Sequence, residues 1–147
     1  MTSGRVDLHA IVEERLRGVG QRYTANRRAL VDALVRARGP VSIGDLLVGR
    51  RAVPQSSAYR NLAMLEQAGV IRRVITDDDF ARFELDEGLT EHHHHLVCSN
   101  CGRIEDVAIP ASVERSIGRT FDRLAKGAGF ASVGHRLDLI GRCRSCA

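Results

Sequence analysis

The sequence predicts an α+β protein of two parts, and three observations predict it. In the first half, apolar residues recur at the spacing of amphipathic helices and then give way to two strand-like runs. In the second half, two C-x-x-C pairs enclose a pattern of strand, helix and strand. The charge is also divided: residues 1–75 hold 13 arginines against 6 acidic residues, net +7, whereas residues 76–147 hold 9 basic against 12 acidic residues, net −3. A basic half suits a polyanionic partner, and an acidic half suits bound cations.

Four short helices are expected in the first half. Thr24 and Ser42 are good N-cap residues, and Ser42 with Asp45 resembles a capping box. Proline favours the first turn of a helix and glycine its end, which fits Pro54 and Gly69. The expected helices cover 8–17, 24 to before 39, 42 to a turn at 49–52, and 54–68, the last with Ala58, Leu62 and Leu65 on its buried face.

The runs Val70–Thr76 and Phe80–Leu85 are typical of a hairpin, with three aspartates at 77–79 as its turn. Helices followed by such a hairpin form a winged helix-turn-helix, whose last helix enters the major groove of double-stranded DNA. The expected DNA contacts are Arg22, Ser56, Ser57, Tyr59 and Arg60. The arginines could instead form a solvated surface, and Tyr59 could be a half-buried packing residue.

A polar hinge is expected over 86–91, so we place one domain over 1–86 and a second over 87–147. The second is expected to be a small α/β domain whose helix carries an apolar stripe. The expected elements are strands over 92–97, 103–108 and 135–141, and a helix over about 112–127 with Val113, Ile117, Phe121 and Leu124 on its stripe.

The four cysteines form two pairs, Cys98 with Cys101 and Cys143 with Cys146, at the spacing with which two thiolates bind one tetrahedral ion. The loop between the pairs is longer than in a compact zinc ribbon, so a Zn²⁺ ion would join two ends of the domain. Two disulfides or four buried thiols are the alternatives. No signal peptide is recognisable over residues 1–12, and we expect a cytoplasmic protein, in which disulfides are rare.

Four consecutive histidines lead into Leu96-Val97-Cys98, a strand-like run. Alternate side chains of a strand point to opposite faces, so His92 and His94 would share one face and His93 and His95 the other. One segment could therefore supply two ligands to each of two metal sites. A solvated polar run is the alternative.

These motifs together resemble the ferric uptake regulator (Fur) superfamily of metal-dependent bacterial repressors. The resemblance covers essentially the whole chain. Its parts are the Ser-Ser-Ala-Tyr-Arg-Asn-Leu helix, the histidine run with Cys98-x-x-Cys101-Gly102, and His135–Ile140 leading into Cys143-x-x-Cys146. It implies a winged-helix DNA-binding domain followed by a dimerisation domain with a four-cysteine zinc site, and therefore a homodimer on operator DNA.

The resemblance also implies the ligands of three metal sites. The four cysteines match the structural zinc site. A regulatory site near the hinge would take Glu84, His93, His95 and Asp106, and another in the dimerisation domain would take His92, His94, Glu114 and His135. Ordinary alternatives stay open for the ligands outside the histidine run. Glu84 could be an exposed wing residue, Asp106 a surface carboxylate with Glu105 as a rival, Glu114 a helix-stabilising acid, and His135 a strand residue bonded to backbone.

The sensed metal is less specified by the sequence. Pro40 stands where iron-sensing members supply a histidine, Ile71-Arg72 stands where zinc-sensing members supply an aspartate, and no fifth cysteine exists. Nitrogen and oxygen ligands without thiolate suit Fe²⁺, Mn²⁺ or Zn²⁺. The carboxylates place Fe²⁺ slightly ahead.

We therefore expect a metal-responsive transcriptional regulator, a repressor and not an enzyme. Neither H-E-x-x-H nor G-x-S-x-G occurs, and no apolar run has the length that a bilayer needs. Neither a membrane nor a small organic substrate is expected as a partner. The alternatives are a zinc-ribbon interaction module without metal-switched DNA binding and, less favoured, a zinc-dependent hydrolase.

Overall fold

The computed structural model describes residues 7–37, 39–48, 54–76, 80–131 and 133–147. Their contacts divide the chain into two compact units, Met1–Glu91 and His92–Ala147. The predicted α+β class is confirmed, with a winged helix-turn-helix followed by a small α/β unit. The predicted domain boundary after residue 86 stays a prediction. Among the described residues, no helix has both the length and the apolar character needed to cross a membrane.

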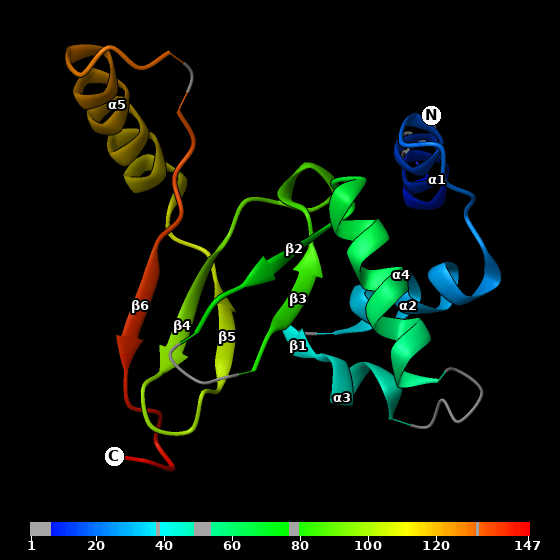
Figure 1. Ribbon diagram of the computed structural model, residues 1–147. Coiled ribbons are helices and arrows are strands. Elements are labelled where there is room, and N and C mark those ends of the chain that lie inside the picture. The colour runs from blue at the N-terminus through cyan, green and yellow to red at the C-terminus, as the bar shows by residue number, and fades with distance from the viewer. Residues whose placement is uncertain (1–6, 38, 49–53, 77–79, 132) are drawn as a thin grey trace, which may run out of the picture. The chain divides into compact units, whose positions relative to one another are not determined.

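The helices of the first unit are α1 (Leu8–Gly18), α2 (Ala25–Arg36), α3 (Ile43–Leu47) and α4 (Gln55–Gln67) (Figure 1). The Thr24 side chain accepts a hydrogen bond from the Arg27 amide and begins α2. Ser42 and Asp45 form the predicted capping box at α3. The predicted turn at 49–52 lies outside the described residues.

A glycine at the end of α4 explains why this helix is followed at once by a strand. Gly69 adopts φ +69°, a left-handed conformation that glycine reaches without steric cost. The Val70 amide then bonds back to the Leu65 carbonyl at 2.9 Å. This turn leads the chain directly from α4 into the strand that begins at Ile71.

The wing is a three-stranded sheet in the order β1-β3-β2, made of β1 (Val41–Ser42), β2 (Ile71–Val74) and β3 (Arg82–Leu85). The predicted hairpin is confirmed as β2 and β3, which pair antiparallel with Ile71 opposite Leu85. The two-residue strand β1 was not predicted, because its length is too short to show alternation. The predicted aspartate turn at 77–79 lies outside the described residues. A 3₁₀ helix, η1 (Glu87–Leu89), replaces part of the expected polar hinge.

One hydrophobic core lies inside the first unit. The predicted inward face of α4 is confirmed, because Ala58, Leu62 and Leu65 are at most 1% exposed. They belong to one cluster of buried apolar side chains that also includes residues of α1, α2, α3 and the sheet, among them Val31 of α2 and Phe83 of β3. Because this core contains no cysteine and no histidine, apolar burial is expected to stabilise the unit without a metal ion.

The second unit contains β4 (His94–Cys98), β5 (Ile104–Val107), α5 (Ala111–Gly127) and β6 (Asp138–Gly141). The sheet order is β5-β4-β6, with β4 antiparallel to β5 and parallel to β6. The expected strand, helix and strand are present, although β4 begins two residues later than predicted and β6 three.

The second unit has almost no apolar interior. Its only buried apolar residue among those described is Cys98, and no residue of α5 is buried. The predicted stripe of α5 is therefore exposed or half-buried, with Val113 at 46% and Leu124 at 65%. In Figure 1 the helix extends past one end of the sheet and does not lie across it.

Shortening a buried valine of the first unit should lower its stability. We expect Val31→Ala to reduce the free energy of unfolding by about 2 kcal/mol, because it removes two buried methyl groups and leaves a cavity. Tyrosine fluorescence during urea unfolding measures this unit alone, because the only tyrosines are Tyr23 and Tyr59 and Trp is absent.

The matched control is Val48→Ala, since Val48 is 77% exposed. That variant should change the unfolding free energy by less than about 0.5 kcal/mol. Equal losses in the two variants would show that the core is not where the structure places it.

Candidate metal centres

Strand β4 is the centre of the second unit, and its register determines which polar side chains meet. His95 lies opposite Asp106 of β5 on one side and opposite Asp138 of β6 on the other. Cys98 lies opposite Gly141, at the other end of the strand. The chain segments that follow β4 and β6 therefore run side by side, and each carries a C-x-x-C pair.

The four cysteines converge as the spacing predicted. Their sulfur atoms all lie within 4.8 Å of one another, and the Cys101 and Cys143 sulfurs are 3.8 Å apart. A tetrahedron with Zn–S bonds of about 2.3 Å has S–S edges of about 3.8 Å, so the spacing fits one Zn²⁺ ion. All four thiols are free in the structure, which does not favour the disulfide alternative.

Backbone amides prepare one of these thiols for metal binding. Hydrogen bonds from the amides of Cys143, Cys101 and Asn100 lower the pKa of Cys98 to about 6, so this residue is a thiolate at neutral pH. The pKa of Cys146 is raised to about 11: a hydrogen bond with Asn100 lowers it, but the neighbouring thiols and desolvation outweigh that effect. One sulfur is therefore ready to bind an ion, and another must release a proton.

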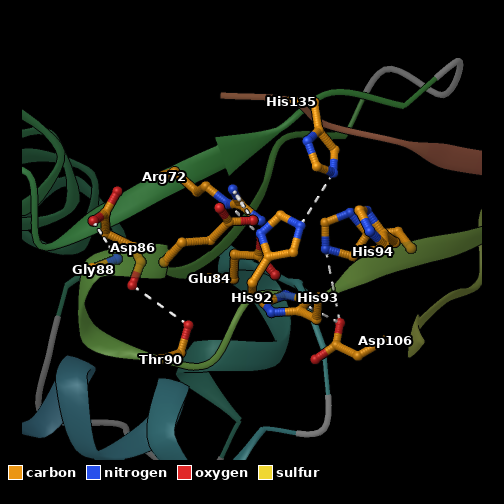
Figure 2. A network of polar contacts seen from close by, with 12 residues as sticks. Arg72, Glu84, Asp86, Gly88, Thr90, His92, His93, His94, Asp106 and His135 are labelled. Atoms are coloured by element: carbon orange, nitrogen blue, oxygen red, sulfur yellow. Dashed lines mark hydrogen bonds and ion pairs between the residues drawn. The ribbon is translucent and has the colours of Figure 1, made fainter. Parts of the chain in front are cut away.

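Three histidines surround one glutamate near the start of β4. The Glu114 carboxylate lies 3.1 Å from His92 Nε2, 2.9 Å from His94 Nε2 and 2.7 Å from His135 Nε2. Figure 2 shows His92 and His135 turned toward each other, with their Nε2 atoms 3.3 Å apart. All four predicted ligands of this cluster thus come together, from β4, the segment just before it, α5 and the segment before β6.

The charge balance of this cluster also suits a cation. The hydrogen bond with His94 and the charges of His92 and His135 lower the pKa of Glu114, against an opposing effect of desolvation. The side chain of His94 is 2% exposed, and its Nδ1 atom is buried with no hydrogen-bond partner. His94 is therefore held through Nε2 alone, the atom that points at the shared carboxylate.

The opposite face of β4 carries a second group. His93 Nε2 and His95 Nε2 each lie 3.8 Å from the same Asp106 oxygen. Both predicted histidines and the predicted aspartate therefore come together within the second unit, and the rival Glu105 bonds to Arg103 instead. This division of the four histidines between two clusters is the one that strand alternation predicts.

Asp138 is a residue of this group that sequence reasoning missed. Its Oδ1 lies 3.1 Å from His95 Nδ1. An Nδ1–H donated to Asp138 leaves the lone pair of Nε2 on the side of Asp106, as metal ligation requires. Only the pairing of β4 with β6 brings these residues together, and no local sequence motif predicts that register.

Glu84, the remaining predicted ligand of the regulatory site, belongs to the first unit. It is 6% exposed on β3, so the alternative of an exposed wing residue is wrong. Arg72 of β2 lies directly opposite, and its Nε donates to Glu84 Oε1 at 2.5 Å.

The outer face of α4 is polar and accessible. Ser56, Tyr59 and Arg60 are exposed and Ser57 is half-buried, opposite the buried face of the helix. Tyr59 is 51% exposed, and Arg22 is exposed before α2. These are the five side chains predicted to contact DNA, and their exposure is compatible with that role.

Comparisons with known proteins agree on one family. A family model described as the ferric uptake regulator family matches residues 18–140. The ferric uptake regulation protein of Legionella pneumophila is 30% identical over 138 residues, which cover 90% of this chain and 96% of that protein. The peroxide operon regulator of Bacillus subtilis (strain 168) is 28% identical over 138 residues, covering 91% and 90%. Among solved structures, the Helicobacter pylori ferric uptake regulator matches with a TM-score of 0.74 at 25% identity, covering 95% of this chain and 93% of that one.

The two displaced thiol pKa values predict how Zn²⁺ affinity depends on pH. Each thiol that must lose its proton on binding makes the affinity rise about tenfold per pH unit. Cys146, with a pKa of about 11, contributes throughout the physiological range, whereas Cys98 contributes only below about 6. The slope of log affinity against pH equals the number of protons released on binding. We therefore expect this slope to increase by about one below about pH 6. Competition with a zinc-binding dye measures this slope, and a constant slope would contradict the assigned environment of Cys98.

Proposed function

Because this chain belongs to the ferric uptake regulator family of metal-responsive regulators, we propose that it is a repressor that binds operator DNA as a homodimer when a divalent ion fills its regulatory site. One observation carries the proposal. The strand β4 and the two histidines before it supply ligand atoms to three groups of donors, two of histidine and carboxylate and one of cysteine. The related Helicobacter pylori protein has a structure described as revealing three functional metal binding sites, which supports the same number here.

The cysteine group is proposed to hold a structural Zn²⁺ ion. Cys98, Cys101, Cys143 and Cys146 would occupy all four positions of the tetrahedron, leaving none for water, which is typical of structural and not catalytic zinc. This argues against the hydrolase alternative. The ion would join β4 to β6 in a unit that has almost no apolar core.

The regulatory site is proposed to take His93, His95 and Asp106 from the second unit and Glu84 from the first. The family resemblance supports the inclusion of Glu84, and the contacts of the other three with one another support theirs. A donor set of two imidazoles and two carboxylates suits Fe²⁺, with Mn²⁺ and Zn²⁺ also possible. Asp138 would hold His95 in the tautomer that exposes its ligand atom.

The cluster of His92, His94, Glu114 and His135 is proposed as a further metal site. Its ligands come from β4 and the segment just before it, from the first turn of α5 and from the segment before β6. An ion here would tie the helix to the sheet, a task that no buried apolar residue of α5 performs.

Dimerisation is proposed because the second unit leaves its apolar surface uncovered in the single chain. Val113, Leu124, Leu139 and Ile140 are between 46% and 65% exposed. An exposed apolar surface of this kind marks an interaction site, and a second copy of the chain is the partner that the family resemblance implies. Two copies would present two recognition helices to successive half-sites of one operator.

The switch is proposed to be a coupling between metal binding and DNA binding. A bound divalent ion supplies a positive charge that imidazole and carboxylate ligands can share. Glu84 lies on the last strand of the wing, and His93 is the second residue of the next unit. Ligands from both sides of the hinge at 86–91 would therefore become fixed together. Ser56, Ser57, Tyr59, Arg60 and Arg22 would then bind operator DNA, with the protein acting in the cytoplasm.

Loss of a regulatory ligand should weaken DNA binding without unfolding the protein. We expect His93→Ala to reduce metal-dependent operator affinity by about tenfold or more. The reason is that metal binding at the regulatory site and DNA binding are coupled, so weaker metal binding removes part of the free energy that favours DNA binding. A fluorescence-anisotropy titration of operator DNA, with and without added Mn²⁺, measures the effect. His9→Ala is the matched control, because His9 contacts Tyr23 and Asp32 and no proposed ligand.

The same titration separates the candidate functions. A metal-switched repressor loses operator affinity when a chelator removes the exchangeable ion. A zinc-ribbon interaction module is indifferent to the chelator, and a hydrolase has no specific DNA affinity to lose. Unchanged operator binding after removal of every exchangeable ion would refute the proposed switch.

Removal of one zinc ligand should instead disrupt the second unit. We expect Cys101→Ser to abolish zinc retention and to unfold the sheet of β4, β5 and β6, because structural zinc contributes folding free energy directly. Zinc content is measured by elemental analysis and the sheet by hydrogen exchange.

Ser145→Ala is the control for this variant, since Ser145 is exposed within the second C-x-x-C pair. It should keep full zinc content and an intact sheet. A Cys101→Ser protein that loses zinc but keeps its exchange protection would show that the ion is not structural.

A further inference from the structure

Arg72 is a buried cation in contact with a proposed metal ligand. Its side chain is 10% exposed, and its place on β2 is directly opposite Glu84 on β3. Its Nε donates to Glu84 Oε1 at 2.5 Å (Figure 2). Its Nη1 lies 2.9 Å from Glu87 Oε1 of η1. One guanidinium thus joins two carboxylates within the first unit.

The environment keeps this arginine charged. Burial by itself would lower the pKa of Arg72, but the hydrogen bond and charge of Glu84 and the charge of Glu87 outweigh it and raise the pKa. The next residue differs: Arg73 is half exposed and pairs with Glu66 at 3.4 Å. Alternation along β2 therefore turns only Arg72 toward the proposed ligand.

We propose that Arg72 is a built-in competitor of the regulatory metal ion for the carboxylate of Glu84, and that it sets the metal concentration at which the protein responds. This inference rests on the proposed role of Glu84 as a ligand. A guanidinium and a divalent cation both seek the lone pairs of the same carboxylate, and their like charges repel at short range. In the absence of the ion, Arg72 neutralises the Glu84 carboxylate, whose burial as an unpaired charge would lower the stability of the first unit.

Glu87 makes the exchange of partners feasible. If Glu84 turns to an ion, Arg72 keeps its contact with Glu87 and is not left as an unpaired buried charge. Arg72 thereby stabilises the metal-free first unit and weakens metal binding with the same side chain. Removing its charge should have opposite effects on these two quantities, which a purely structural role would not produce.

The test measures Mn²⁺ affinity and metal-free stability in parallel. All proteins carry Glu114→Gln, which removes the one carboxylate of the cluster of three histidines and so weakens Mn²⁺ binding there equally in every protein compared. Arg72→Met removes the charge at similar length, and Arg72→Gln removes it while keeping a hydrogen-bond donor for Glu84. Arg73→Met is the matched control, because it removes an arginine from the opposite face of the same strand.

We expect Arg72→Met and Arg72→Gln to bind Mn²⁺ about tenfold more tightly, within the range of coupling between contacting residues. Both should unfold at lower urea when metal-free, Arg72→Gln less so, with tyrosine fluorescence as the probe. Arg73→Met should leave the Mn²⁺ affinity unchanged. If Arg72→Met does not fold, Arg72→Gln alone decides the outcome.

A Glu84→Gln protein distinguishes competition by Arg72 from the role of Glu84 as a metal ligand. If Glu84→Gln weakens Mn²⁺ binding while the Arg72 variants bind no more tightly than the parent, the competition is refuted and the proposed regulatory site survives. If Glu84→Gln leaves Mn²⁺ affinity unchanged, Glu84 is not a ligand, and the inference fails together with that part of the proposed function.

Discussion

The register of β4 against its two neighbours is the constraint on which the second unit depends. Shifting one strand by a single residue would turn each of its side chains to the opposite face. The observed register sets His95 between Asp106 and Asp138, and it sets the two C-x-x-C segments side by side. The same alternation sends His92 and His94 toward Glu114. The two pairings of β4 thus help to position the donors that the second unit supplies to all three clusters.

The two units achieve order by different means. The first buries a continuous apolar core that extends from α1 to β3. The second buries two histidines and a cysteine, and its long helix buries nothing. Such a unit cannot offset the conformational entropy of folding by apolar burial alone. The proposed ions and the proposed second copy of the chain would supply the remaining stability, and they would link metal binding, assembly and folding in this part of the molecule.

Much of this architecture could be predicted from the sequence, because its signals are local. The caps at Thr24 and Ser42, the inward face of α4 and the alternation of the histidine run each depend on neighbouring residues. The missed features depend on pairing between distant segments: the two-residue β1 exists only against β3, and Asp138 meets His95 only through the β4–β6 register. The ion pair of Arg72 with Glu84 likewise needs the β2–β3 register.

The parallel pairing of β4 with β6 has a consequence for biosynthesis. Cys98 and Cys101 leave the ribosome well before Cys143 and Cys146, which complete their cluster. At about 5 to 20 residues per second, the interval is roughly 2 to 8 seconds. During that time the sequence of the first unit is complete, whereas the early thiols and the histidines beside them have not yet met their later partners. Until the second pair has been made, the nascent chain therefore holds only half of the four-cysteine cluster.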